Sequence, residues 1–109
     1  MATADVAVMG GGIFGLAIAF VCARRGARVI LCERDRIGAG VSGGLVGALA
    51  PHVPEQWNAK KAFQLERLLM AGAFWEEVRA VSGIDPGYAR SGRWQPLADA
   101  EAVARAEER

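Results

Sequence analysis

The chain has 109 residues and a formal net charge of +1, with 52% hydrophobic and 23% charged residues. This length allows one small domain or part of a larger one, and the composition is that of a globular protein. A charge balance so close to neutral gives no electrostatic basis for binding nucleic acid or an anionic membrane surface, so neither is expected as a partner. Cys22 and Cys32 lack metal-ligand spacing, so we expect no metal site and predict two buried thiols in a reducing, cytoplasmic protein.

A glycine-rich turn near the start of the chain is the strongest local signal. The short apolar run 6–9 leads directly into Gly-Gly-Gly-Ile-Phe-Gly at 10–15, and a further apolar stretch follows. This order predicts a strand, a tight turn and a helix. In such a corner Gly10 permits the turn, Gly12 lets a diphosphate approach the backbone, and Gly15 lets the helix pack on the strand. The N–H groups and the positive dipole end of the helix then face the phosphates.

The same residues invite a second interpretation. Residues 6–23 are uncharged and mostly apolar, and they are nearly long enough to span a bilayer or to form a signal-peptide core. However, Asp5 precedes this run, glycines interrupt it, and its basic residues, Arg24 and Arg25, come after it. A signal peptide carries its positive charge before the apolar core. A strand, turn and helix are therefore favoured, and no membrane span is expected.

A second strand is predicted at residues 28–32, after the first helix ends near Gly26. It ends at Glu33, eighteen residues beyond Gly15. An acidic side chain at the tip of the second strand accepts hydrogen bonds from both ribose hydroxyls of an adenosine. The fold class is therefore α/β, with a Rossmann-like βαβ segment that forms an incomplete doubly wound parallel sheet.

A second glycine-rich segment, residues 38–48, follows Arg34-Asp35-Arg36. Its glycines and Ser42 let the backbone approach a ligand and offer hydroxyl and N–H donors. A plain NAD-binding unit has no need for this loop, whereas a larger cofactor lying across the sheet edge does. The segment favours FAD, and a non-catalytic module that binds NAD or another nucleotide stays open as an alternative.

At residues 10–15, 33–35, 38–44 and 47–49 the chain resembles the D-amino-acid oxidase and glycine oxidase family of FAD-dependent amine oxidoreductases. The resemblance is strong over residues 4–52 and looser over 53–97. It implies FAD as cofactor and oxidation of the CH–NH group of an amino acid or amine to an imine that hydrolyses. Gly-Ala-Leu-Ala-Pro at 47–51 is also similar to the flavin oxidase module of some tRNA-modifying enzymes, which is a further alternative.

The resemblance divides the cofactor-binding residues among the parts of FAD. The first glycines hold the diphosphate, the acidic residue binds the ribose, the Arg-Asp stretch flanks the adenosine, and the serine–glycine loop runs along the ribityl chain and flavin ring. Leu45 and Val46 stand where the family often has small or polar residues. We assign no catalytic acid, base or nucleophile. The implied cofactor-binding residues are Gly10, Gly12, Ile13, Phe14, Gly15, Glu33, Arg34, Ser42, Gly43, Gly47 and Ala48.

The remaining sequence predicts mostly helix. A long apolar helix is predicted over residues 59–81, with Asn58 as its N-cap. A short strand is predicted over 88–97, and Asp99 is expected to cap a final helix that runs to Arg109. The remaining large aromatic residues are expected to pack in a core or a domain interface: Trp57, Trp75, Tyr88 and Trp94.

Residues 1–82 are expected to form the N-terminal part of an FAD-binding domain, and residues 83–109 the start of a substrate domain. The fold of the resembled family needs further strands and a large substrate domain. We therefore expect this chain to be the N-terminal piece of a longer protein, whose partners are the remainder of its own chain and a small-molecule amine or amino acid. A truncated product without a stable fold is the last alternative.

Overall fold

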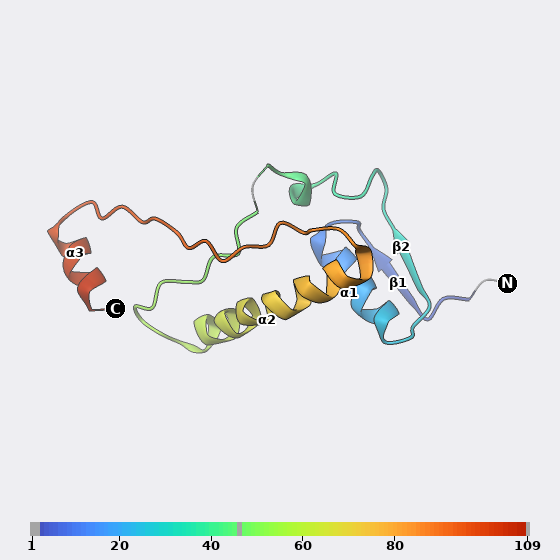
Figure 1. The fold of residues 1–109 in the computed structure, drawn as a ribbon, viewed down its shortest axis with the longest axis horizontal. Coiled ribbons are helices and arrows are strands. Elements are labelled where there is room, and N and C mark those ends of the chain that lie inside the picture. Colours follow the sequence, from blue (N-terminus) through green and yellow to red (C-terminus); the bar gives the residue numbers. More distant parts are fainter. Residues whose placement is uncertain (1–2, 46, 109) are drawn as a thin grey trace. The chain divides into compact units, whose positions relative to one another are not determined.

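The computed structural model describes residues 3–45 and 47–108, and the chain divides into two compact units, Met1–Ala48 and Leu49–Arg109. Val46, expected in the flavin loop, and Arg109, expected at the end of the last helix, lie outside the described residues. The elements in chain order are β1 (Val6–Met9), α1 (Ile13–Arg24), β2 (Val29–Cys32), a short 3-10 helix η1 (Val41–Gly43), α2 (Ala59–Ser82) and α3 (Ala100–Glu107) (Figure 1).

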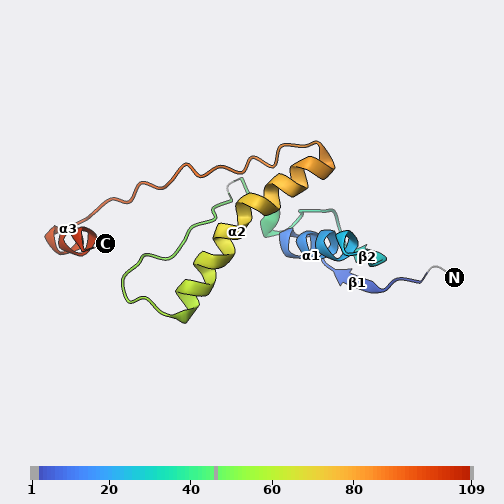
Figure 2. The ribbon, with the colours of Figure 1, turned by 60° about the horizontal axis from the view of Figure 1, so that its bottom comes forward.

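The first unit contains a βαβ arrangement. β1 and β2 are parallel neighbours, with Val6 opposite Val29 and Met9 opposite Cys32. The crossover between them is α1, which contacts both strands (Figure 1, Figure 2). The predicted order of strand, glycine turn, helix and strand is confirmed, and so is the mixed α/β class. The described residues form a two-stranded sheet, so a doubly wound sheet is not shown.

The two faces of this sheet differ in burial. Val8 faces α1 and is only 8% exposed, whereas on the opposite face Met9 is 79% and Ile30 is 47% exposed. Cys32 lies opposite Met9 on that second face and is exposed, and Cys22 in α1 is half-buried. The prediction that both thiols are buried is therefore wrong. It failed because successive residues of a strand point to opposite faces, and only one face lies against α1.

Gly15 permits the close packing of α1 on β1. A Cβ atom at this position would lie 1.9 Å from the Gly10 carbonyl oxygen and 3.4 Å from Val8 Cγ1. Gly10 has a φ of 107°, a conformation that L side chains rarely adopt. The turn after β1 and the approach of α1 thus each depend on the absence of a side chain.

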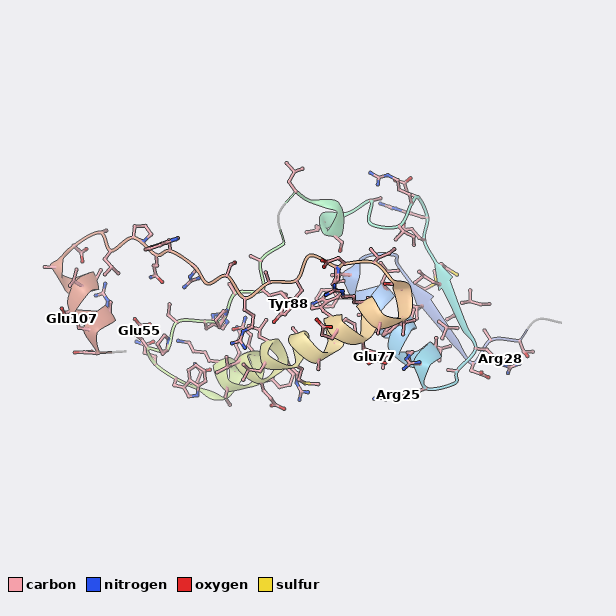
Figure 3. The ribbon with its side chains drawn as sticks, viewed as in Figure 1. Arg25, Arg28, Glu55, Glu77, Tyr88 and Glu107 are labelled. Atoms are coloured by element: carbon pink, nitrogen blue, oxygen red, sulfur yellow. The ribbon has the colours of Figure 1, made fainter. Side chains whose placement is uncertain are left out.

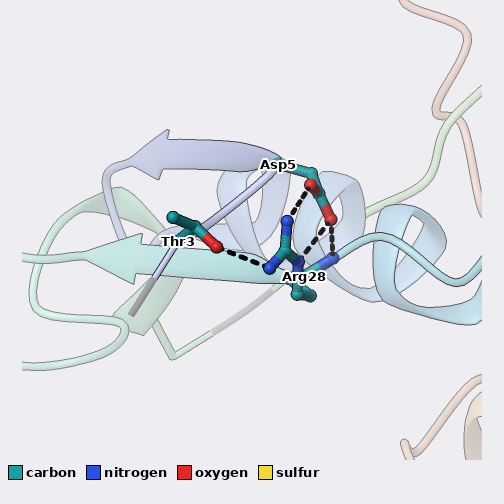
Figure 4. A network of polar contacts seen from close by, with 3 residues as sticks. All are labelled: Thr3, Asp5 and Arg28. Carbon is teal, nitrogen blue, oxygen red and sulfur yellow. Dashed lines mark hydrogen bonds and ion pairs between the residues drawn. The ribbon is translucent and has the colours of Figure 1, made fainter. Parts of the chain in front are cut away.

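An ion pair joins the residues just before the two strands. The Asp5 carboxylate accepts hydrogen bonds from the Arg28 main-chain N–H at 2.8 Å, from Nε at 3.0 Å and from Nη2 at 2.7 Å (Figure 4). Arg28 Nη1 donates to Thr3 Oγ1 at 2.6 Å. The Arg28 guanidinium lowers the pKa of Asp5, and the carboxylate raises the pKa of Arg28. Because both side chains are well exposed, the pair adds little stability.

The second unit consists of an irregular segment, residues 49–58, then α2, a second irregular segment and α3. Asn58 Oδ1 accepts from the Lys61 N–H at 3.1 Å, and Asp99 Oδ1 accepts from the Ala102 N–H at 2.7 Å. Both predicted N-caps are therefore confirmed, as are the two helices that they begin. Gly83 ends α2 at a φ of 69°. Among the described residues, no helix has the length and apolar character needed to cross a membrane.

The predicted strand over residues 88–97 is wrong, because residues 84–98 have no regular secondary structure. A strand needs a neighbour to pair its backbone N–H and C=O groups, and the described part of the chain places none beside this segment. Trp57 and Trp94 are 51% and 99% exposed, so packing in a core of the described residues is wrong for them, and packing in a domain interface stays a prediction. Trp75 and Tyr88 are half-buried, and Trp75 meets the Phe74 ring edge-on at 5.1 Å.

We expect Gly15→Ala to lower the free energy of unfolding by about 1–3 kcal/mol, because its methyl group must displace the Gly10 carbonyl or separate α1 from β1. Gly72→Ala is the matched control. It lies within α2, where a Cβ atom meets nothing within 4 Å, and should raise the free energy of unfolding by about 0.5–1 kcal/mol. Urea denaturation followed by circular dichroism measures both, and equal effects would contradict the packing role of Gly15.

Candidate functional site

The N-terminus of α1 is joined to the second glycine segment. The Leu16 N–H donates to the Gly12 carbonyl at 2.9 Å and closes the first helical turn. The N–H groups before it have no acceptor within the helix. One of them, the Ile13 N–H, donates to Ser42 Oγ at 2.9 Å, although Ser42 lies 29 residues further along the chain. The two glycine segments found in the sequence therefore meet at this helix end.

Backbone contacts hold the second glycine segment against the first. The Gly38 N–H donates to the Gly11 carbonyl at 2.9 Å. A Cβ atom at Gly11 would lie 2.6 Å from Ile37 Cδ1, and one at Gly43 would lie 2.1 Å from the Gly38 carbonyl oxygen. Gly43 is thus required for closure of this loop, whatever its contact with a ligand.

Glu33 lies directly after β2, with its carboxylate against the first glycine turn. Oε2 accepts from the Gly11 N–H at 2.7 Å, and Oε1 accepts from the Asp35 N–H at 3.0 Å. These bonds lower the pKa of Glu33, and the Gly11 N–H has the larger effect. The side chain is therefore ionised and oriented at neutral pH.

A pocket of about 310 Å³ lies between these elements. Its lining brings together four of the residues that the sequence assigned to the cofactor, Gly12, Glu33, Arg34 and Ser42. Gly47 and Ala48 are exposed and are not part of its lining. The lining residues are Gly12, Glu33, Arg34, Asp35, Ala39, Gly40, Val41 and Ser42.

Sequence reasoning missed the two residues that orient Glu33. Gly11 and Asp35 act through their main-chain N–H groups, which leave no mark in residue type. The sequence offered no signal for them, because any residue other than proline supplies the same main-chain N–H.

The chemistry of this pocket fits a nucleoside diphosphate. A carboxylate at one side suits vicinal ribose hydroxyls. At the other side, Ser42 Oγ accepts the Ile13 N–H as an anionic oxygen does at a helix N-terminus. Gly12 leaves room for a ligand to approach the backbone beside Ser42, because a Cβ atom at Gly12 would lie 3.1 Å from Ser42 Oγ. Within residues 3–45 and 47–108, no cluster of three or more His, Cys, Asp or Glu side chains is arranged to hold a metal ion.

Comparison with known proteins agrees with this chemistry. Residues 5–109 match the family described as DAO, FAD dependent oxidoreductase. The chain belongs to the DAO family. This family is FAD-dependent, so the resemblance and the cofactor inferred from the sequence are confirmed.

Relatives in the DAO family include enzymes of two kinds. The chain is 37% identical over 91 residues to glycine oxidase of Geobacillus kaustophilus, a match that covers 81% of this chain and 24% of that enzyme. It is 37% identical over 81 residues to the tRNA 5-methylaminomethyl-2-thiouridine biosynthesis bifunctional protein MnmC of Chromohalobacter salexigens, covering 74% of this chain and 11% of MnmC. For MnmC of Aliivibrio fischeri the identity is 32% over 74 residues, or 67% of this chain and 11% of MnmC. The chain thus spans a quarter or less of these relatives.

We expect Glu33→Gln to weaken the dependence of the free energy of unfolding on pH in the acid range. The folded pKa of Glu33 lies below its unfolded value, so its stabilising effect is complete above the unfolded pKa and is lost as the pH falls through the folded one. Below about pH 4.3 the free energy of unfolding should therefore fall more steeply in the wild type than in the variant. Urea denaturation across this range tests it. Glu76→Gln, at an exposed position of α2, is the control and should keep the wild-type slope of the free energy of unfolding against pH. If Glu33→Gln also keeps the wild-type slope, the expectation is refuted.

Proposed function

We propose that this pocket binds the ADP part of FAD, in a protein that oxidises the CH–NH group of an amino acid or amine. The supporting observation is that Glu33 and Ser42 line one pocket, and that Ser42 Oγ accepts a hydrogen bond from the Ile13 N–H at the N-terminus of α1. Membership of the DAO family supports the cofactor, and the match to glycine oxidase supports an amine substrate.

The hydrogen-bond capacity of the two side chains supports these roles. Each carboxylate oxygen of Glu33 can accept more than one hydrogen bond, so the side chain can bind ribose hydroxyls while it keeps the N–H bonds from Gly11 and Asp35. The Ser42 hydroxyl accepts from Ile13 and retains its own proton, which it can donate to a phosphate oxygen. The site is therefore compatible with a ligand without loss of the contacts that shape it.

Other residues take supporting roles in this proposal. The N–H groups of the first turn of α1, from Ile13 to Gly15, are assigned to the phosphates, because they lack helical acceptors and carry the positive end of the dipole. Arg34, which lines the pocket, is assigned to the adenosine. Gly47 and Ala48 are assigned to the flavin end.

When bound, FAD would supply the redox chemistry as hydride acceptor for the carbon that bears the amine, so that the substrate becomes an imine that hydrolyses. The residues of this chain bind and orient the cofactor. We propose that residues 1–82 belong to the FAD-binding domain, that residues 83–109 begin the substrate domain, and that the remainder of a longer chain completes the substrate site.

A second candidate is the flavin module of a tRNA-modifying enzyme. It is favoured by the identity to two MnmC proteins and by the sequence Gly-Ala-Leu-Ala-Pro at 47–51. In this case the oxidised amine belongs to a modified tRNA nucleoside and not to a free amino acid.

We expect the full-length gene product to purify with FAD and to show a flavin absorbance band that bleaches when glycine or another small amine is added without oxygen. Stopped-flow absorbance measures this reduction. Bleaching by modified tRNA but by no free amine would favour the second candidate. A colourless protein that FAD cannot reconstitute would contradict both.

We also expect Glu33→Gln to weaken ADP and FAD binding by roughly tenfold, because a charge-assisted hydrogen bond to the ribose becomes a neutral one. Isothermal titration calorimetry measures both affinities. Glu76→Gln is the matched control and should bind both ligands as the wild type does. Wild-type affinity in Glu33→Gln would show that the carboxylate does not bind the ribose.

A further inference from the structure

The segment that follows β2 returns to the glycine turn after β1, and Ile37 is the residue whose side chain reaches that turn. Arg28, labelled in Figure 3, marks the start of β2, and this segment leaves from the other end of the strand. A Cβ atom at Gly11 would lie 2.6 Å from Ile37 Cδ1. The end of the Ile37 side chain therefore occupies the place that a side chain at Gly11 would need.

The aliphatic part of Glu33 borders the same space. Its Cβ and Cγ atoms would each lie 3.2 Å from a Cβ atom at Gly11. Ile37 Cδ1 and two carbon atoms of Glu33 thus lie around one point beside Gly11, which is buried although Ile37 itself is 53% exposed. A side chain that is packed along its aliphatic part has fewer rotamers open to it. Ile37 therefore restricts where the Glu33 carboxylate can lie.

This packing lies beside the hydrogen bond that orients the Glu33 carboxylate. The Gly11 N–H donates to Glu33 Oε2 at 2.7 Å, and the bond is partly buried. The Gly38 N–H, one residue after Ile37, donates to the Gly11 carbonyl at 2.9 Å, so the side chain and the main chain of this segment approach Gly11 together. A hydrogen bond to a charged group is stronger where water is kept from it.

Ile37 is not among the residues that line the pocket, whereas Glu33 is. We propose that Ile37 is a positioning residue for the ribose end of the cofactor site: by filling the space beside Gly11, its side chain holds the Glu33 carboxylate in the orientation that binds the ribose hydroxyls. This inference rests on the proposed function. Ile37 acts through Glu33, so its loss weakens the contact with the ribose and not the contacts with the rest of the nucleotide.

The test compares ADP with 2′,3′-dideoxy-ADP, which lacks both ribose hydroxyls, by calorimetric titration of the full-length gene product after removal of its FAD. We expect the wild type to bind ADP about tenfold more tightly than the dideoxy nucleotide, because hydrogen bonds to the charged Glu33 are lost with the hydroxyls. Ile37→Ala should reduce this preference to about threefold and leave the affinity for dideoxy-ADP within about twofold of the wild type.

Three further variants separate positioning from stability. Ile18→Ala is the matched control, because Ile18 lies in α1 beyond its first turn, is also 53% exposed and loses the same atoms; it should keep the wild-type preference. Ile37→Met keeps an unbranched chain long enough to reach Gly11 and should restore most of the preference. In a Glu33→Gln background, Ile37→Ala should change the preference little, because the carboxylate that it positions is gone.

An unchanged preference for ADP in Ile37→Ala overturns the positioning role and leaves the proposed function intact. Equal losses of affinity for the two nucleotides also overturn it, because they reduce Ile37 to a residue of general stability. A wild type that binds the two nucleotides equally tightly overturns the ribose role of Glu33 in the proposed function, and this inference with it. If Ile37→Ala does not fold, Ile37→Val, which removes only Cδ1, must lower the preference in the same direction.

Discussion

Gly11 is the point at which the first unit is held together. Its N–H donates to Glu33 after β2, and its carbonyl accepts from Gly38 at the start of the second glycine segment. The first bond brings the Glu33 carboxylate to the Gly11 main chain, and the second brings the Gly38 main chain to it. The lack of a side chain at Gly11 leaves room for Ile37. The residue is buried in a chain whose side chains are largely exposed. The pocket exists because the turn after β1, the tip of β2 and the loop that follows all meet at this glycine.

The electrostatics of the pocket follow from the same arrangement. Glu33 brings a full negative charge to one side, and two backbone N–H groups hold it ionised. The N-terminus of α1 brings partial positive charge to the other side, and Ser42 Oγ, an uncharged acceptor, satisfies only one of its N–H groups through the bond to Ile13. A ligand with a hydroxyl-bearing sugar at one end and a diphosphate at the other matches both signs of charge at once.

Sequence alone predicted the elements that depend on local information. The strand, turn and helix at residues 6–24 follow from apolar periodicity and glycine spacing, and the helices after Asn58 and Asp99 follow from their capping side chains. The strand expected over 88–97 was wrong because a strand needs a partner, and the described residues place none beside this segment. The presence or absence of a partner leaves no local signal in the sequence. Of the groups that shape the pocket, the side chains of Glu33 and Ser42 were named from the sequence. The main-chain donors at Gly11 and Asp35 were not, because any residue type supplies them.

The uncovered face of the sheet has a consequence for how this chain behaves in solution. Met9 and Ile30 present apolar surface to water, and within residues 3–45 and 47–108 each of the two strands pairs with a strand along one edge only. Such a surface attracts other apolar surfaces, and an unpaired edge accepts an additional strand. Wherever this face is left uncovered, self-association competes with the folded monomer and increases with protein concentration. The side of the sheet that faces away from α1 is therefore one of the exposed apolar surfaces that favour self-association of the first unit.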